Sequence, residues 1–260
     1  MKIPARKTIL LTTLGATVVV TALFAATHAL LPNNLLTGRN VNGMVFTVTN
    51  QLLRPWGRQA LIQGRPVDLA IDADGGKLAV LNSNRVDVFD SLTGQLLGAM
   101  NTGSATYAGV AFRPGTAELW ASAGGRGMRG GGGSGDTIAV ATVDAKGHPG
   151  EPSRISLTGR AIPVGIGFTS DGTRAYVALN RNNTVAVVDA QTHKVVREIP
   201  VGMAPFGVAV AEGRGRVFVT NRGGRPPKPG ENTSTSSGVA MLTDPVTGAT
   251  TTGTVSVIGL

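Results

Sequence analysis

Short runs of hydrophobic residues alternate with clusters of turn-forming residues through most of the chain. Residues 163–205 show the pattern best, with hydrophobic runs at residues 166–168, 175–179, 185–188 and 195–199 separated by Ser, Asp, Gly and Asn. Runs rich in β-branched and aromatic residues favour strands, and turn residues between them indicate hairpins. The segment therefore predicts four antiparallel strands, which is the make-up of one β-propeller blade.

The same unit recurs along the chain. Repeats begin near residues 66, 107, 163 and 205, at spacings of 41, 56 and 42 residues. The long spacing comes from a Gly-rich insertion at residues 124–135, between the second and third strands of its repeat. A longer insertion, rich in Gly, Pro, Ser and Thr, occupies residues 222–253 at the same place in the fourth repeat. Insertions confined to one hairpin position project from one face of a propeller, and such loops often bind partners.

The fourth repeat is shorter than the others. Residues 254–258 (TVSVI) match the third strand of the previous repeat, residues 184–188 (TVAVV), and no fourth strand follows. Residues 59–62 precede the first repeat and are predicted to form the outer strand of a closing blade. The sequence thus predicts about half of a propeller, because closed rings use four to eight blades. We expect unpaired strand edges at both ends. Either the chain is the front of a longer protein, or a short chain pairs with itself through these edges.

The N-terminus resembles an export signal. Lys2, Arg6 and Lys7 precede an uncharged apolar stretch at residues 8–26, and Ala29 ends a small-x-small cleavage motif. This order is typical of a secretory signal peptide. The apolar stretch is long, so an uncleaved membrane anchor formed by residues 8–26 is the alternative. Either interpretation predicts that the rest of the chain is exported, to the periplasm or outside the cell.

Composition agrees with an all-β protein. Charged residues make up 15% of the 260 residues, and 37 residues are Gly, which suits many tight turns. The absence of Cys excludes disulfides and Cys-ligated zinc. The net charge of +9 comes from scattered basic residues and not from a basic run with aromatic residues. Weak attraction to polyanions is therefore expected, but specific nucleic-acid recognition is not.

No residue set predicts catalysis, a metal site or a cofactor. His148 and His193 lie in separate predicted turns. Asp72 and Asp74 flank another turn without the spacing of a calcium-binding EF-hand. The first insertion lacks the Gly-Lys-Ser/Thr of a phosphate-binding loop, and no Gly-x-Ser-x-Gly motif occurs. Asp recurs after the third strand of successive repeats, which indicates a turn residue rather than a catalytic one.

The two insertions carry the only candidate contact residues. Arg126 and Arg129 lie in the Gly-rich insertion, and Arg222, Arg225 and Lys228 lie in the Pro-rich one. A stiff basic loop could contact an anionic ligand or a protein partner. The competing interpretation is an insertion that faces solvent and binds nothing.

The repeats resemble the YVTN-type propeller repeat of the YncE-like family. The matching residues are 175–180 (AYVALN), 184–189 (TVAVVD) and 217–221 (VFVTN), together with Pro163 and Pro205 at the repeat starts. A closer resemblance, carried by residues 54–58, 221–230, 244–248 and 252–258, is to one subgroup of that family. In that subgroup an exported seven-bladed propeller is fused to a C-terminal phosphoesterase domain of the alkaline phosphatase superfamily. This chain contains none of that domain, so no metal ligand or nucleophile is assigned to it.

These observations together predict a signal peptide or anchor at residues 1–29, a leader at 30–57 and a partial propeller at 58–260. The predicted fold is all-β, about half of a seven-bladed propeller of four-stranded antiparallel blades, preceded by a signal helix. The predicted function is a non-catalytic, exported scaffold for binding or interaction. Two alternatives are an N-terminal part of a phosphoesterase, and a half-propeller that associates with itself through its exposed strand edges.

Overall fold

The computed structural model describes residues 38, 40–41, 44–49, 51–53, 57, 59–60, 62–103, 107–124 and 136–260. The chain divides into two compact units, Met1–Gln59 and Ala60–Leu260. The predicted signal helix lies outside the described residues, as do Arg126 and Arg129. No helix among the described residues is long and apolar enough to cross a lipid bilayer.

The first unit contains one small antiparallel sheet. Its strands are β1 (Asn40–Val41), β2 (Met44–Phe46) and β3 (Leu52–Leu53), in the order β1-β2-β3. The outer strand predicted at residues 59–62 is not formed, because Gln59, Ala60 and Ile62 lie outside strands. In the second unit, the segment that precedes the first blade is held by a side-chain hydrogen bond instead of by strand pairing. Asn82 Nδ2 donates to the carbonyl of Gln63 at 2.6 Å.

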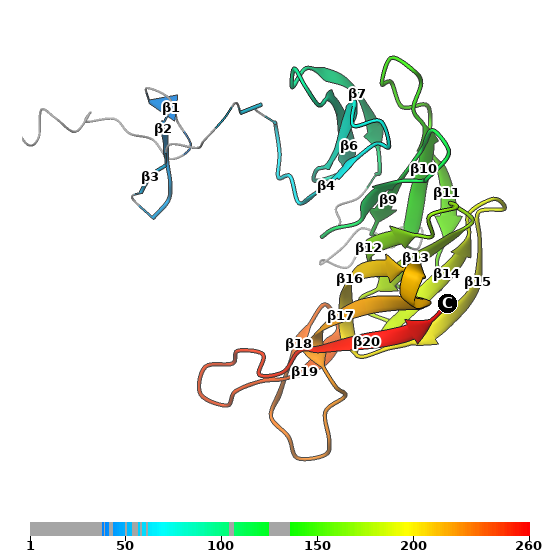
Figure 1. Ribbon diagram of the computed structural model, residues 1–260. Coiled ribbons are helices and arrows are strands. Elements are labelled where there is room, and N and C mark those ends of the chain that lie inside the picture. Colours follow the sequence, from blue (N-terminus) through cyan, green and yellow to red (C-terminus); the bar gives the residue numbers. More distant parts are fainter. Residues whose placement is uncertain are drawn as a thin grey trace, which may run out of the picture. The chain divides into compact units, whose positions relative to one another are not determined.

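Four of the five antiparallel sheets in the described part of the second unit follow one another along the chain, and we number them blades 1 to 4 (Figure 1). Blade 1 consists of β4 (Asp68–Ile71), β5 (Lys77–Leu81), β6 (Arg85–Asp90) and β7 (Leu96–Asn101). Blade 2 consists of β8 (Val110–Phe112), β9 (Glu118–Ala123), β10 (Thr137–Thr142) and β11 (Ser153–Ser156). Both of these sheets follow chain order from the first strand to the fourth, as expected for hairpin-connected blades.

Blade 3 is the most regular of the four. It consists of β12 (Pro163–Phe168), β13 (Arg174–Leu179), β14 (Thr184–Asp189) and β15 (Lys194–Pro200). Blade 4 has three strands in the order β16-β17-β20: β16 (Met203–Ala211), β17 (Arg216–Gly224) and β20 (Thr254–Gly259). A short 3₁₀ helix, η1 (Glu212–Arg214), joins β16 to β17. The predicted match between residues 254–258 and the third strand of blade 3 is confirmed, since β20 pairs with β17.

The third turns of the blades are built by one recurring side chain. Asp90 Oδ1 accepts from the backbone N–H of Thr93 at 2.6 Å and from its hydroxyl at 2.7 Å. Asp189 Oδ1 accepts from the corresponding groups of Thr192 at 2.8 and 2.9 Å. The carboxylates thus replace backbone groups in closing the turns, which is why Asp recurs there.

Hydrophobic side chains between neighbouring blades form the core. Trp120 of blade 2 is fully buried and meets the ring of Phe168 of blade 3 edge-on, with centroids 5.0 Å apart. Tyr176 of blade 3 is 1% exposed and belongs to the cluster shared with blade 4. Side chains also bond blade to blade: Asn180 Nδ2 donates to the carbonyl of Pro205 at 3.1 Å. The protein is therefore all-β and forms part of a propeller, as the sequence predicted.

Candidate binding surface

The insertion of blade 4 is folded, although its composition predicts only a loop. It contains a hairpin of β18 (Thr233–Ser236) and β19 (Val239–Leu242). The two residues between these strands, Ser237 and Gly238, have φ values of 54° and 80°. Positive φ at both central residues is the type I′ geometry that matches the twist of a two-residue hairpin. The hairpin therefore has a turn suited to a defined strand register.

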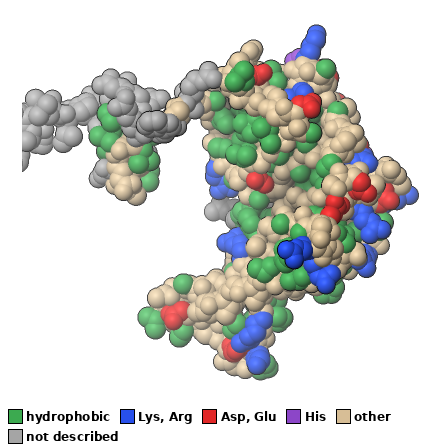
Figure 2. Space-filling model, viewed as in Figure 1, with side chains coloured by type: hydrophobic (Ala, Val, Ile, Leu, Met, Phe, Trp, Pro, Cys, Tyr) green, Lys and Arg blue, Asp and Glu red, His purple; other side chains and the backbone are tan. Residues whose placement is uncertain are grey.

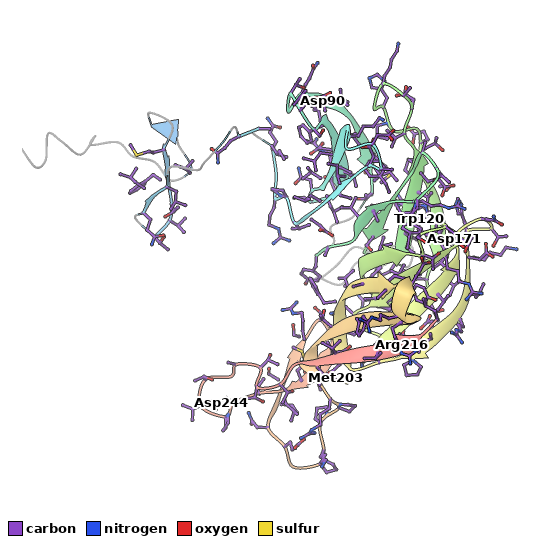
Figure 3. The ribbon with its side chains drawn as sticks, in the orientation of Figure 1. Asp90, Trp120, Asp171, Met203, Arg216 and Asp244 are labelled. Carbon is purple, nitrogen blue, oxygen red and sulfur yellow. The ribbon has the colours of Figure 1, made fainter. Side chains whose placement is uncertain are left out.

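Buried side chains fix this hairpin to blade 4. Val239 is 3% exposed and Met241 is 7% exposed, and both pack against Ala204 and Met203 at the start of β16. Figure 3 shows Met203 beside the hairpin. Gly223 permits the close approach, because a Cβ there would lie 2.7 Å from Met241 Cγ. The insertion thus has a small hydrophobic core of its own, continuous with the blade.

Hydrogen bonds to one carboxylate close the Pro-rich part of the insertion. The Arg225 guanidinium donates to both oxygens of Glu231, with N–O distances of 2.9 and 2.5 Å. The backbone N–H of Lys228 donates to Glu231 Oε2 at 2.6 Å. The Arg225 hydrogen bonds, followed by the one from Lys228, lower the pKa of Glu231 to about 2. This loop is accordingly closed by its own charges at neutral pH.

Two further cations border the hairpin. The guanidinium of Arg222 lies 5.1 Å from the centroid of the Phe206 ring, within the range of a cation–π contact. Arg181, from the second turn of blade 3, packs against the hairpin turn: a Cβ on Gly238 would lie 2.6 Å from Arg181 Cζ. Lys228 is exposed in the Pro-rich part of the same insertion, so the insertion and its borders carry Arg181, Arg222 and Lys228. We call this set the insertion surface.

The candidate contact residues predicted in the Pro-rich insertion fall into two groups in the structure, those with free access to solvent and one that is paired within the loop. Arg222 and Lys228 are exposed, as a contact role requires. Arg225 is also exposed, but its guanidinium is engaged by Glu231 within the same loop. Figure 2 shows basic side chains beside an acidic one at the end of the insertion. Sequence reasoning missed Arg181, because it lies in a tight turn of a regular repeat and only the folded hairpin brings it to the surface.

A polar cluster between blades 2 and 3 also concentrates charge. Glu118 Oε2 accepts from Trp120 Nε1 at 2.9 Å and pairs with Arg113 Nη1 at 3.2 Å, while His193 Nε2 lies 3.2 Å from Glu118 Oε1. Burial opposes ionisation of Glu118, but the hydrogen bonds from Trp120 and Arg113 and the charge of His193 keep its pKa below the usual value. Arg113 Nε also donates to the carbonyl of Gly172 in blade 3 at 2.7 Å. The cluster joins two blades through satisfied partners, which is a structural role.

Neither a metal centre nor a substrate site emerges from the part of the chain that the structure describes. No three His, Asp or Glu side chains among the described residues group closely enough to hold a metal ion. A cavity of about 390 Å³ is lined by Asp72, Asp74 and Phe112. The carboxylate of Asp72 is already paired, since Lys77 Nζ lies 3.3 Å from its Oδ2. The insertion surface is therefore the best candidate for a functional site.

Comparison with known proteins supports the fold and goes no further. No protein-family model matches the chain, and no curated protein matches it. Among solved structures, hydrazine synthase of Kuenenia stuttgartiensis aligns over 77% of this chain and 53% of its own, with 20% identity and a TM-score of 0.51. A protein of unknown function from Desulfotomaculum acetoxidans aligns over 81% of this chain and 61% of its own, with 15% identity and a TM-score of 0.50.

A third structure is a propeller domain, that of Cps50 (Swd1) from Myceliophteria thermophila. It aligns over 69% of this chain and 56% of its own at 12% identity, with a TM-score of 0.48 that is too low to add weight. The chain thus spans between 53% and 61% of the length of the three structures. Identities this low show the fold alone and assign no function.

Proposed function

We propose that the protein is an exported, non-catalytic propeller scaffold that binds an anionic protein segment through the insertion surface. One observation carries the proposal: the insertion is anchored by buried Val239 and Met241, yet it leaves Arg222 and Lys228 exposed. A solvent-facing loop without a binding role has no need of a hydrophobic core. The export signal predicted at residues 1–29 supports the exported location.

Preorganisation is the physical reason for this choice. A hairpin that is already ordered loses little conformational entropy when a partner binds, so its cations contribute more of their attraction to affinity. Arg222 is held over Phe206 and Arg181 is held against the hairpin turn, which reduces the freedom of both guanidinium groups. The net charge of +9 falls to +6 when Lys2, Arg6 and Lys7 are removed with the signal, and this positive charge also attracts anionic partners at long range.

The binding test uses a synthetic oligoglutamate peptide as the anionic probe. The variant R222Q/K228Q should weaken its binding roughly fivefold, because two exposed charge contacts are lost. The matched control K194Q/R197Q removes two exposed cations from β15 of blade 3 and should bind as the unchanged protein does. Binding should also weaken as salt rises. Equal loss in both variants, or no binding at low salt, would contradict the proposal.

The YncE-like resemblance supplies the second candidate, in which the native protein is a phosphoesterase and this chain is its propeller part. The observation that favours it is the match of residues 221–230 and 244–248 to the loop of the fused subgroup. The intact mass of the native gene product, measured from its source cells, tests this directly. A mass far above that of residues 30–260, together with hydrolysis of p-nitrophenyl phosphate, would favour the phosphoesterase. The mass of the short chain with no hydrolysis would favour the scaffold.

A further inference from the structure

A first turn joins the first strand of each blade to its second strand. It comprises residues 72–76 in blade 1, 113–117 in blade 2 and 169–173 in blade 3, and in blade 4 it contains η1. The turns of blades 1 to 3 have the same length and follow equivalent strand pairs, which are Ile71 with Leu78, Phe112 with Leu119 and Phe168 with Ala175. Their residues can therefore be compared position by position.

Direct hydrogen bonds join the first turns of blades 2, 3 and 4. Arg113, the first residue of the turn in blade 2, donates from Nε to the carbonyl of Gly172 in blade 3 at 2.7 Å. A Cβ on Gly172 would collide with the carbonyl oxygen of Pro114, so these two turns are in contact. Ser170, the second residue of the turn in blade 3, donates from its backbone N–H to Glu212 Oε1 in η1 at 2.9 Å. Both junctions are therefore closed at this end of the strands.

The first turn of blade 1 does not reach blade 2 in this way. Asp72 holds the position of Arg113, but its carboxylate bonds within its own hairpin. Its Oδ1 accepts from the backbone N–H of Lys77 at 2.9 Å, and Lys77 Nζ lies 3.3 Å from its Oδ2. Ala73 holds the position of Ser170 and has no polar side chain. The cavity of about 390 Å³ described above lies at this junction, lined by both turns.

The lining of the cavity is apolar on one part and charged on another. The apolar part comes from Phe112, Ala117 and Val143, and the charged part from Asp72, Asp74 and Lys77. The paired charges of Asp72 and Lys77 offset each other. The carboxylate of Asp74 therefore gives the cavity one negative charge in excess.

Asp74 lacks the hydrogen bonds that its equivalent in blade 3 receives. Asp171, labelled in Figure 3, accepts from Thr169 Oγ1 at 2.7 Å and from the backbone N–H of Thr173 at 2.9 Å. In blade 1 the positions of these two threonines are held by Asp72 and by a glycine, neither of which has a hydroxyl group. None of the described residues donates a hydrogen bond to Asp74 or forms an ion pair with it. Its carboxylate can therefore accept a cation from another molecule.

We propose that this cavity binds an alkylammonium group, with Asp74 as its counter-charge and the apolar lining around its carbon stem. A volume of about 390 Å³ lies within the range of small-ligand pockets, which is about 300–1,000 Å³. The aromatic ring of Phe112 also favours an organic cation. A metal ion fits less well, because hard cations require several oxygen ligands and the oxygens of Asp72 are already engaged.

This site is separate from the insertion surface. The strand β17 begins at Arg216, directly after the first turn of blade 4, and ends at Gly224, where the chain enters the insertion. First turns and the insertion therefore lie at opposite ends of the second strands. Binding in the cavity is thus a second function, which neither requires nor follows from the proposed binding of an anionic segment.

The net charge of the protein makes the choice of probes decisive. At +9 the protein as a whole attracts anions and repels cations. A preference for a cation must therefore come from the local carboxylate. Three probes share a four-carbon stem: n-butylammonium carries the charge, n-butanol is neutral, and butyrate carries the opposite charge.

The test is a titration of the protein with each probe, followed by the amide chemical shifts of Ala73 and Gly115, which both line the cavity. Butylammonium should shift both amides with saturation and a dissociation constant on the order of millimolar. Butanol should bind about threefold to fivefold more weakly, because it lacks the ion pair with Asp74. Butyrate should produce no saturable shift. Equal responses to butylammonium and butyrate would overturn the proposal.

Two variants separate the charge of the site from its shape. Asp74→Asn should weaken butylammonium binding about threefold to fivefold and leave butanol binding unchanged. Its matched control is Glu151→Gln, which removes another exposed carboxylate outside the cavity. Ala117→Phe should abolish binding of both probes by filling the cavity, whereas Ala145→Phe adds the same bulk to an exposed turn and should have no effect. Unchanged binding in Asp74→Asn would contradict the assigned counter-charge.

The same titration distinguishes the two sources of an alkylammonium group. The tripeptide acetyl-Gly-Lys-Gly-amide presents a lysine side chain as a protein partner would. Tighter binding of the tripeptide than of butylammonium would assign the cavity to a lysine of another protein, and weaker binding would assign it to a free aliphatic amine. Absence of saturable shifts with both probes would overturn the proposal and would leave the binding test of the insertion surface unaffected.

Discussion

Blades 3 and 4 share a strand pattern but differ in what surrounds it. Tyr176 in blade 3 and Phe218 in blade 4 occupy the same register position, yet Tyr176 is 1% exposed and Phe218 37%. The turn after β13 is short, whereas β17 is followed by the folded insertion with β18 and β19. The repeat motif thus specifies which side chains face the next blade, but only the presence of a neighbour buries them.

The same contrast applies to glycines of the inner strands. Gly165 of blade 3 and Gly207 of blade 4 hold equivalent positions, one residue before Ile166 and Val208. A Cβ on Gly165 would lie 2.5 Å from the carbonyl oxygen of Phe206 in the next blade, whereas one on Gly207 would meet nothing closer than Thr220 Oγ1 at 3.2 Å. Glycine therefore recurs at this position of the repeat, although only in blade 3 does a neighbouring strand leave no room for a side chain.

The largest effect is expected from truncating the equivalent aromatic residues. Tyr176→Ala should lower the free energy of unfolding by about 3–5 kcal/mol, because it empties a buried position. Phe218→Ala should cost about 1 kcal/mol, since its ring is already partly in water. Denaturant unfolding measures both free energies. Equal losses would show that Phe218 is buried as fully as Tyr176.

An intermediate effect is expected from the glycine pair. Gly165→Ala should lower the free energy of unfolding by about 1–3 kcal/mol, because the added methyl group forces two inner strands apart. Gly207→Ala is the matched control and should cost less than about 1 kcal/mol. Thermal unfolding midpoints of the two variants measure this difference. A Gly207→Ala variant as unstable as Gly165→Ala would mean that another strand lies close to blade 4.

The smallest effect is expected from acid. Protonation of Asp189 in blade 3 should destabilise the whole fold, whereas protonation of Glu231 should loosen only the insertion. Hydrogen bonds from Thr192 hold the pKa of Asp189 below its usual value of 3.8, and those from Arg225 lower the pKa of Glu231 to about 2. Both contributions to stability are complete above the unfolded pKa. They are lost as the pH falls through the lower, folded pKa. Acid should therefore destabilise the protein below about pH 4.

Two substitutions separate these contributions. Asp189→Asn should flatten the fall of the unfolding midpoint between pH 4 and pH 2, because one linked proton is removed. Glu231→Gln should leave that curve unchanged but speed hydrogen exchange of the Lys228 amide at neutral pH, since this amide loses its charged acceptor. If Glu231→Gln shifted the global curve as well, the insertion would unfold together with the blades.

Much of the fold could be predicted from local patterns. The alternation of Val, Ala and aromatic residues with Asp-rich turns locates the strands of blade 3, and the match of residues 254–258 to residues 184–188 identifies β20 across a long insertion. These features depend on short-range propensity and repetition. The strand at residues 59–62 was predicted wrongly, because Asn82 holds the entering chain by side-chain hydrogen bonds that no periodicity reveals.

The candidate site could be predicted only in part. A basic insertion is visible in the sequence, and Arg222 and Lys228 are indeed exposed. The polar sequence of residues 233–242 hides a hairpin whose few apolar residues, Val239 and Met241, become buried only against β16. Arg225 was assigned to contacts, but the fold closes it on Glu231. Figure 3 places Asp244 in the turn that follows this hairpin.

The sequence by itself determined the repeat, the strand register and the turn chemistry, because each depends on neighbours a few residues away. Asp90 and Asp189 build their turns with a Thr three residues on, wherever the blade lies. Only the tertiary structure decided burial and contact between distant segments. Whether Phe218 faces a blade or water, and whether Arg181 meets Gly238, depends on packing between elements far apart in the chain, which local propensity does not encode.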